Sequence, residues 1–189
     1  IEAVAWRDVA ELNAFLGRRG FGAAFQPFSP PDFGSAAILD LRGHWPRPGM
    51  PSSIRTRDGV ECPAVVTAIG ARVDFFRVAG HPHPVSRMKT AAGDAVWMTM
   101  QDQPSNVEDI GALAARLEAG RPAENEFEGL VFPMIDLAME TDLSWLVGLS
   151  TVDALDQPSF VAQAGQKNTL KMNETGFRAR SATFLKVSG

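Results

Sequence analysis

A long alternating stretch at the C-terminal end of the sequence most constrains what this chain can form. Between Lys167 and Asn173, Leu170 and Met172 alternate with polar residues, and the alternation resumes after Gly176. Successive side chains of a strand point to opposite faces. One face of the second segment would therefore carry Phe177, Ala179, Ser181, Thr183 and Leu185, and the other Arg178, Arg180, Ala182, Phe184 and Lys186. The pattern predicts two strands joined by a turn.

The second of these strands has two interpretations. Its first face is small in the middle, at Ala179, Ser181 and Thr183. Small residues suit a strand that enters a crowded space, because overpacking a core costs roughly 1–3 kcal/mol, and Gly176 would then be a hinge. In the other interpretation the Glu-Thr-Gly sequence is the turn of an ordinary hairpin that ends in an edge strand. The alternation by itself favours the ordinary hairpin, with the arginine-bearing face toward solvent.

The rest of the chain predicts a mixed α and β fold that is richer in strand. Helical spacing of Trp6, Val9, Leu12, Phe15 and Leu16 predicts a helix over residues 3–16. A capping box of Ser105 and Glu108 predicts a second helix that ends at Gly120. Hairpin signals occur at Asp58-Gly59 and at residues 91–94. Strands are expected at residues 36–41, 64–69, 73–78, 85–90, 95–100 and 130–137, and Thr141 is expected to cap a short helix that buries Leu143, Leu146 and Val147.

Composition excludes several classes of protein. The 189 residues carry 18 Lys and Arg against 22 Asp and Glu, and the net charge of −4 does not suit a nucleic-acid binder. We find no apolar run long enough to span a membrane. A single cysteine, Cys62, excludes an internal disulfide.

The usual signatures of catalysis and metal binding are missing from the sequence. It contains no nucleophile elbow, no P-loop and no dinucleotide-binding glycine motif. His81 and His83 have no carboxylate or cysteine near them in sequence and fit a polar loop better than a metal pair. Glu124, Glu126 and Glu128 fit a solvated strand face better than a cation site, and Cys62 fits a small hydrophobe better than a nucleophile. The sequence predicts that the protein is not an enzyme and has neither a cofactor nor a metal.

Several segments together resemble the serpins. Residues 173–183 (NETGFRARSAT) are similar to the serpin hinge, which typically reads Asn-Glu-x-Gly-x-x-Ala-x-Ala-Ala-Thr. Residues 36–45 (AAILDLRGHW) resemble the family's Asn-Ala-x-Tyr-Phe-Lys-Gly-x-Trp segment. Residues 130–137, 141–143 and 148–149 resemble the strand, the helix start and the Leu-Gly segment that precede the hinge. The resemblance covers roughly residues 35–189, in order and without rearrangement.

The resemblance implies an α+β fold of mixed sheets with flanking helices and a bait mechanism. A serine or cysteine protease would cleave an exposed reactive loop, and the loop would then insert into the central sheet as a new strand. The implied hinge and loop residues are Glu174, Thr175, Gly176, Phe177, Ala179, Ser181, Ala182 and Thr183. The residue that sets protease specificity would lie beyond Gly189, or would be Lys186 if the loop is short. The alternative is a non-inhibitory binding or scaffold protein on the same fold.

Departures from the family pattern bear on this choice. Phe177 and Arg178 replace small or acidic residues, so insertion would bury a bulky ring early. We therefore expect Phe177→Thr to improve an inhibitor and to leave a scaffold protein unaffected. The strand before the hinge has Gln166 in place of the usual histidine, although the following Lys167 is retained.

The resemblance also defines the expected organisation and partners. The chain is interpreted as one serpin-like domain or a portion of one: a helix and connector at 1–34, a sheet core at 35–173, and the hinge and reactive loop at 174–189. The family's N-terminal helical half has at most residues 1–34 as a counterpart in it, and the strands that follow the family's reactive loop have none. The expected partners are a target protease and a second chain, or another copy, that completes the core. The expected location is extracellular or secreted, with the cytoplasm as the alternative.

Overall fold

The computed structural model of the chain describes residues 1–22, 24–67, 73–101, 107–117, 120–123, 127–152 and 156–189. The chain divides into two compact units. The first contains Ile1–Arg42, Asp136–Lys171 and Arg178–Gly189, and the second contains Gly43–Ile135 and Met172–Phe177. Each unit has its own sheet structure and its own buried apolar cluster.

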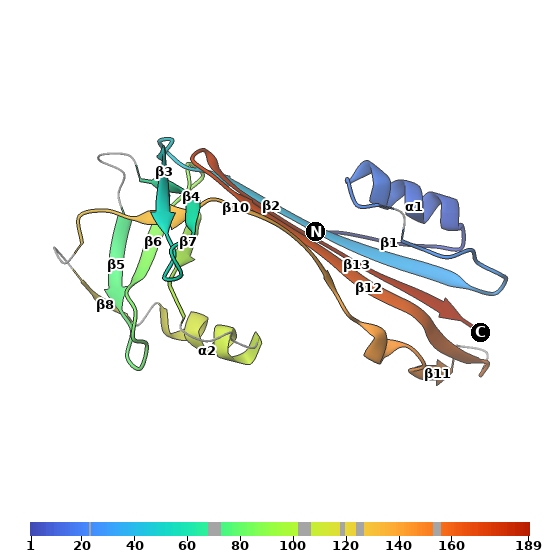
Figure 1. Cartoon of the computed structure of the whole chain (residues 1–189). Helices are drawn as coiled ribbons and strands as arrows, with labels where there is room; N and C mark the ends of the chain where they lie inside the picture. Colours follow the sequence, from blue (N-terminus) through green and yellow to red (C-terminus); the bar gives the residue numbers. More distant parts are fainter. Residues whose placement is uncertain (23, 68–72, 102–106, 118–119, 124–126, 153–155) are drawn as a thin grey trace. The chain divides into compact units, whose positions relative to one another are not determined.

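The first unit is built on a sheet of long strands. The strand order is β1 (Glu2–Trp6), β2 (Phe33–His44), β13 (Gly176–Ser188), β12 (Pro158–Met172) and β10 (Ile135–Thr141), and β11 (Ser150–Val152) pairs with β12 outside this path. Figure 1 shows β2, β13 and β12 side by side over most of their length. The predicted C-terminal pair of strands is confirmed. The edge position expected of an ordinary hairpin is wrong, because β13 lies between β2 and β12.

Helix α1 (Val9–Arg18) packs on one face of this sheet. The Asp8 side chain accepts hydrogen bonds from the backbone N–H of Ala10, at 2.7 Å, and of Glu11, at 3.3 Å, as a helix N-cap does. The helix predicted over residues 3–16 was therefore placed too early. Residues 2–6 form β1 instead, paired antiparallel with β2, because their alternating apolar side chains fit a strand as well as a helix.

The core of the first unit lies between α1 and the sheet. Apolar side chains of the helix and the connector after it contact side chains of β2 and β13 (Leu12, Phe15, Leu16, Phe21, Phe25, Ala36, Ile38, Ala182 and Phe184). Trp6 meets Phe15 edge-on, with ring centroids 5.7 Å apart. This core fixes which face of β13 is buried.

The second unit contains two small sheets and a helix. One sheet has the order β3 (Met50–Arg55), β4 (Glu61–Val66) and β9 (Val131–Pro133). The other has the order β7 (Ala95–Met98), β6 (Val85–Lys89), β5 (Val73–Arg77) and β8 (Arg121–Pro122), and the helix is α2 (Val107–Leu117). Both predicted hairpin turns are confirmed, by the antiparallel pairs β3–β4 and β6–β7.

The segment after β9 differs from the prediction. Pro133 ends β9 and β10 begins at Ile135, so the strand is interrupted as expected. Thr141 ends β10 rather than capping a helix, and Asp142 instead accepts a hydrogen bond from the backbone N–H of Ser144 at 2.8 Å. The turn that follows is a short 3₁₀ helix, Ser144–Leu146. Leu143 and Leu146 are only half-buried and Val147 is 48% exposed, because the turn lies at the surface.

Two further predictions fall partly outside the described residues. They concern the capping box, of which Ser105 and the side chain of Glu108 are not described, and the alternating glutamates, of which Glu124 and Glu126 are not described. Among the helices that the structure does describe, none combines the length and the apolar character needed to cross a membrane.

Candidate functional site

The turn between β12 and β13 is closed by Asn173. Its side-chain oxygen accepts hydrogen bonds from the backbone N–H of Thr175, at 2.9 Å, and of Gly176, at 3.2 Å. The hydroxyl of Thr175 donates to the same oxygen at 2.8 Å. An Asn side chain that bonds the backbone two residues on is a known turn-forming arrangement. The first four residues of the hinge-like motif therefore form a compact turn, in which Glu174 is half-buried and Thr175 is exposed.

The first residues of β13 are closely packed against the end of β2. A Cβ atom on Gly176 would overlap the carbonyl oxygen of Gly43, so only glycine fits at position 176. The ring of Phe177 in turn occupies the space that a side chain at Gly43 would need, and it lies 5.8 Å from the Trp45 ring, centroid to centroid. The Trp45 indole N–H donates to the carbonyl oxygen of Asn173 at 2.9 Å. The bulky Phe177 ring is thus accommodated beside Gly43 and Trp45.

The buried face of β13 is the one that we expected to face solvent. Ala182 is 1% exposed, and Phe184 packs with it in the core beneath α1. The Phe184 ring lies over Gly165 of β12, where a Cβ atom would overlap it. This expectation was wrong because α1, a distant segment of the chain, covers this face.

The small residues of the opposite face are partly buried. Ala179, Ser181 and Thr183 all have intermediate exposure. The Gln166 side-chain amide of β12 donates to the hydroxyl of Ser181 at 3.0 Å. Gln166, which stands where the family usually has histidine, therefore contacts β13 directly.

Two arginines of β13 lie close to a carboxylate on β2. Arg178 donates from Nε to Asp40 Oδ1 at 3.0 Å and from a terminal nitrogen to Asp40 Oδ2 at 2.6 Å, a two-pronged arrangement. Arg180 Nε lies 3.8 Å from Asp40 Oδ2, and Arg42 lies 3.6 Å from it. Hydrogen bonding to Arg178 lowers the pKa of Asp40, partly opposed by burial, and the charges of the three arginines add to the lowering. Asp40 in turn raises the pKa of Arg178.

Arg180 is held between the strand and the segment after α1. Its side chain is 16% exposed, and its guanidinium carbon lies 4.6 Å from the centroid of the Phe21 ring. A guanidinium over an aromatic face gains a cation–π attraction. The prediction that Arg180 faces solvent is therefore wrong, since Phe21 and Asp40 surround it.

Lys186 is fixed at the far end of β13. Its ammonium lies 2.9 Å from Asp32 Oδ2, donates to the carbonyl oxygen of Pro27 at 3.1 Å and lies 5.5 Å from the centroid of the Phe28 ring. Asp32 also accepts a hydrogen bond from the backbone N–H of Ser29 at 2.9 Å. The Ser29 bond first, and Lys186 second, lower the pKa of Asp32 to about 2. Lys186, the candidate specificity residue, is only 14% exposed in this arrangement.

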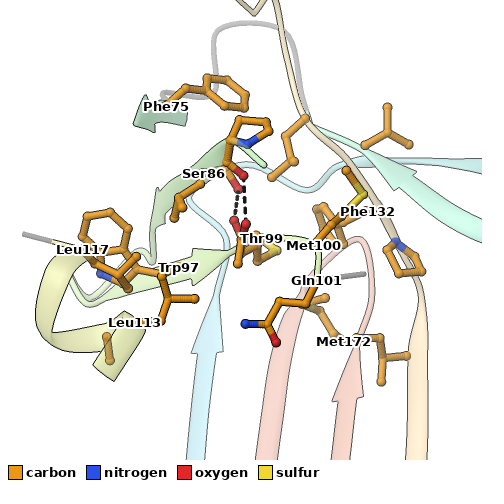
Figure 2. Close-up of a pocket in the computed structure, with 18 of the residues that line it drawn as sticks. Phe75, Ser86, Trp97, Thr99, Met100, Gln101, Leu113, Leu117, Phe132 and Met172 are labelled. Carbon is orange, nitrogen blue, oxygen red and sulfur yellow. Dashed lines mark hydrogen bonds between the residues drawn. The ribbon is translucent and has the colours of Figure 1, made fainter. Parts of the chain in front are cut away.

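The second unit holds an apolar cavity of about 650 Å³. Figure 2 shows Trp97 of β7 with Leu113 and Leu117 of α2 on one side of it, and Phe132 of β9 with Met172 on the other. The hydroxyl of Thr99 at the cavity donates to the carbonyl oxygen of Pro84 at 3.0 Å. Sequence reasoning missed this cavity, since its walls come from segments that are far apart in the sequence.

The other residues considered for chemistry do not form a site among the described parts of the chain. His81 and His83 are neighbours, with ring centroids 6.1 Å apart, and His81 Nε2 lies 2.7 Å from the hydroxyl of Thr99. No group of three potential ligands among the described residues could hold a metal ion. Cys62 is a free, partly buried thiol.

Comparisons with known proteins identify the fold. The sequence matches no protein-family model and no curated protein. The structure is similar to that of the viral serpin CrmA (TM-score 0.71, 14% identity, 95% of this chain and 70% of that one). It is also similar to reaction-loop-cleaved lamprey angiotensinogen (0.74, 14%, 96% and 62%) and to thyroxine-binding globulin complexed with thyroxine-fluorescein (0.63, 13%, 94% and 60%).

These similarities confirm the expected fold class. The chain has a serpin-like fold in a partial or divergent form, mostly sheet with few helices, and it spans 60–70% of the length of the three serpin structures. The likeness rests on three-dimensional arrangement rather than on sequence, because identity is 13–14%.

Proposed function

We propose that this chain is a serpin-like inhibitor of serine or cysteine proteases that acts by cleavage of a bait loop and insertion of the loop as a strand. The observation that carries the proposal is the position of β13 between β2 and β12. A strand in the middle of a sheet has neighbours along both edges, so its hydrogen-bonding groups are satisfied on both sides. This is the arrangement that an inserted bait loop would have after cleavage.

In the proposed mechanism, the attack of the protease on the loop starts the reaction that traps the protease. The Ser hydroxyl or Cys thiol of the protease attacks a peptide carbonyl carbon of the loop, the C–N bond breaks, and the new amine leaves with the downstream peptide. The acyl group then remains attached to the protease. Insertion of the segment that begins at Gly176 would draw the acylated protease along the sheet and distort it before water hydrolyses the ester or thioester.

The packing of the turn supports the role of residues 174–183 as the hinge. Gly176 and Gly43 allow two backbones to approach closely, and Phe177 fills the adjoining space against Trp45. The ring that departs from the family pattern therefore has a matching site, which favours insertion.

The test is to mix the intact protein with trypsin-like, chymotrypsin-like and subtilisin-like proteases. An inhibitor gives a protease complex that survives SDS and a large rise in thermal stability after loop cleavage. The variant Ala182→Arg should be cleaved without forming the complex, because a charged side chain would enter the core beneath α1. Lys171→Gln, a change at an exposed position of β12 outside the hinge, serves as the control. Simple degradation of the unmodified protein, with no gain in thermal stability, would contradict the proposal.

A second candidate function, a non-inhibitory binding protein, is favoured by the apolar cavity. Its volume of about 650 Å³ lies in the range of small-molecule sites, and its walls are mainly apolar and aromatic. Thyroxine-binding globulin, which has a similar structure, is complexed with thyroxine-fluorescein. An apolar fluorescent probe should then bind the wild-type protein and bind more weakly to Leu113→Trp, which fills the cavity. Binding without any SDS-stable protease complex would favour this function over inhibition.

We further propose that the protein is not an enzyme and that a second chain, or another copy of this one, completes its core. Leu137 and Met139 of β10 and Phe160 of β12 are about half exposed, which is unusual for large apolar residues in a sheet. Light scattering of the purified protein tests self-association.

Protease targets fit an extracellular or secreted protein, with the cytoplasm as the alternative.

A further inference from the structure

Two carboxylates contact basic residues at opposite ends of β13. Asp40 of β2 is paired with Arg178, and Asp32, just before β2, is paired with Lys186. Eight residues separate Arg178 from Lys186, and eight residues separate Asp32 from Asp40. The two strands run in opposite directions, since the start of β13 meets the end of β2. Both ion pairs therefore fit the same register of the two strands.

The register of the strand must be fixed near its ends, because its middle does not fix it. Residues 179–183 are Ala, Arg, Ser, Ala and Thr, and apart from Arg180 they are small. A slip of two residues keeps every side chain on its own face, so the alternating pattern cannot prevent it. After such a slip Lys186 would leave Asp32, and Phe184 would leave the space over Gly165 that only glycine provides.

We propose that Asp40 and Asp32 are positioning residues that set the register of β13 in the sheet. Asp40 binds the start of the strand through Arg178 and Arg180, and Asp32 binds its end through Lys186. This inference rests on the proposed function for its role in inhibition, since register matters there only if the segment inserts.

The positions of the two pairs give them different roles during insertion. Arg178 lies two residues after the hinge glycine, so Asp40 contacts the strand when insertion has just begun. Lys186 lies ten residues after Gly176, so it reaches Asp32 only when the strand is fully in place. The Lys186 pair is well shielded, with side chains 14% and 9% exposed, which makes the attraction stronger than at the surface. Asp40 thus guides the strand, and Asp32 retains it.

The test is a pair of double-mutant cycles on the full chain, Asp40→Asn with Arg178→Gln and Asp32→Asn with Lys186→Gln, read as the unfolding midpoint. Each single variant should lower the midpoint by about 3 °C or more. Each double variant should lose clearly less than the sum of its two singles, because the partners act together. Additive losses in both cycles would overturn the proposal.

Two further variants separate charge from packing. Lys186→Arg keeps the charge and should retain most of the stability, whereas Arg178→Lys keeps the charge but loses the two-pronged contact and should retain part of it. Losses as large as those of the glutamine variants would contradict a role of charge. Lys171→Gln removes the exposed pair with Asp136, whose side chains are 67% and 71% exposed, and should leave the midpoint unchanged.

A protease assay distinguishes this inference from the proposed function. If the wild-type protein forms the SDS-stable complex, Asp32→Asn should consume at least about twice as many inhibitor molecules for each protease trapped, because a strand that is not retained allows the protease to escape. An unchanged ratio would remove the role in inhibition. If the wild type forms no complex while the cycles show coupling, the proposed function fails and the role of the carboxylates in register stands.

Discussion

The ring of Phe177 occupies the space that a side chain at Gly43 would fill. A Cβ atom on Gly43 would overlap the Phe177 ring and would also lie 2.8 Å from the Thr90 methyl carbon. Trp45 packs against the same ring, with centroids 5.8 Å apart. A large residue at position 177 and glycine at position 43 are therefore parts of one packing arrangement, although they lie far apart in the sequence.

The first prediction concerns Gly43→Ala. The added methyl group must displace the Phe177 ring, and overpacking of this kind costs roughly 1–3 kcal/mol. Urea denaturation should show this loss in the free energy of unfolding. The matched control is Gly17→Ala in α1, where a Cβ atom meets nothing within 4 Å and where alanine should stabilise the helix by about 0.5–1 kcal/mol. Equal effects of the two substitutions would contradict the packing of Gly43 against Phe177.

The second prediction concerns Phe177→Thr, and it reverses the expectation from the sequence. We expected the bulky ring to hinder insertion, so that threonine would improve an inhibitor. In the structure the ring is half-buried against Trp45, and its removal leaves a gap beside Gly43. Phe177→Thr should therefore cost about 1–3 kcal/mol, somewhat less than the loss of a fully buried Phe. Thermal unfolding and protease trapping both check this. A higher unfolding midpoint, or more protease trapped than by the wild type, would contradict this prediction.

The sequence predicted local features of the C-terminal segment better than its surroundings. Alternation correctly indicated two strands, because side-chain parity is a local property of an extended chain. The buried face of β13 could not be predicted, since it depends on α1, which lies far away in sequence. The central position of β13 likewise depends on pairing with β2, a long-range contact that no local pattern encodes.

Some of the site residues had a sequence signal whose meaning was not apparent. Gly43 was noted as part of a family-like segment, and its role became clear only from the ring beside it. Arg178 and Arg180 were assigned to solvent because charged residues usually are. Asp40 and Phe21, which contact them, lie on other elements, and nothing in a single sequence pairs them.

The third prediction concerns Phe184→Ala. The ring is buried beneath α1 and meets Phe25 edge-on, with centroids 5.5 Å apart. Truncation of a buried Phe costs about 3–5 kcal/mol, because the site over Gly165 cannot close around alanine. Denaturant unfolding should show this loss. Leu185→Ala, on the partly buried opposite face, should cost clearly less, and a larger cost there would contradict the assignment of the buried face.

The last prediction concerns the pH dependence of stability that Asp32 contributes. Its pKa falls from 3.8 to about 2 on folding, because it accepts the Ser29 N–H and pairs with Lys186. A carboxyl group with a lowered pKa stabilises the folded state fully above its unfolded pKa, and this contribution is lost as the pH falls toward the folded pKa. Wild type should therefore be more stable than Asp32→Asn at pH 6, and the difference should shrink between about pH 4 and pH 2. The comparison with Asp32→Asn isolates this group, since the pKa of Asp40 is lowered in both proteins. A difference that stays constant down to pH 2, or grows there, would show that Asp32 does not act through its charge.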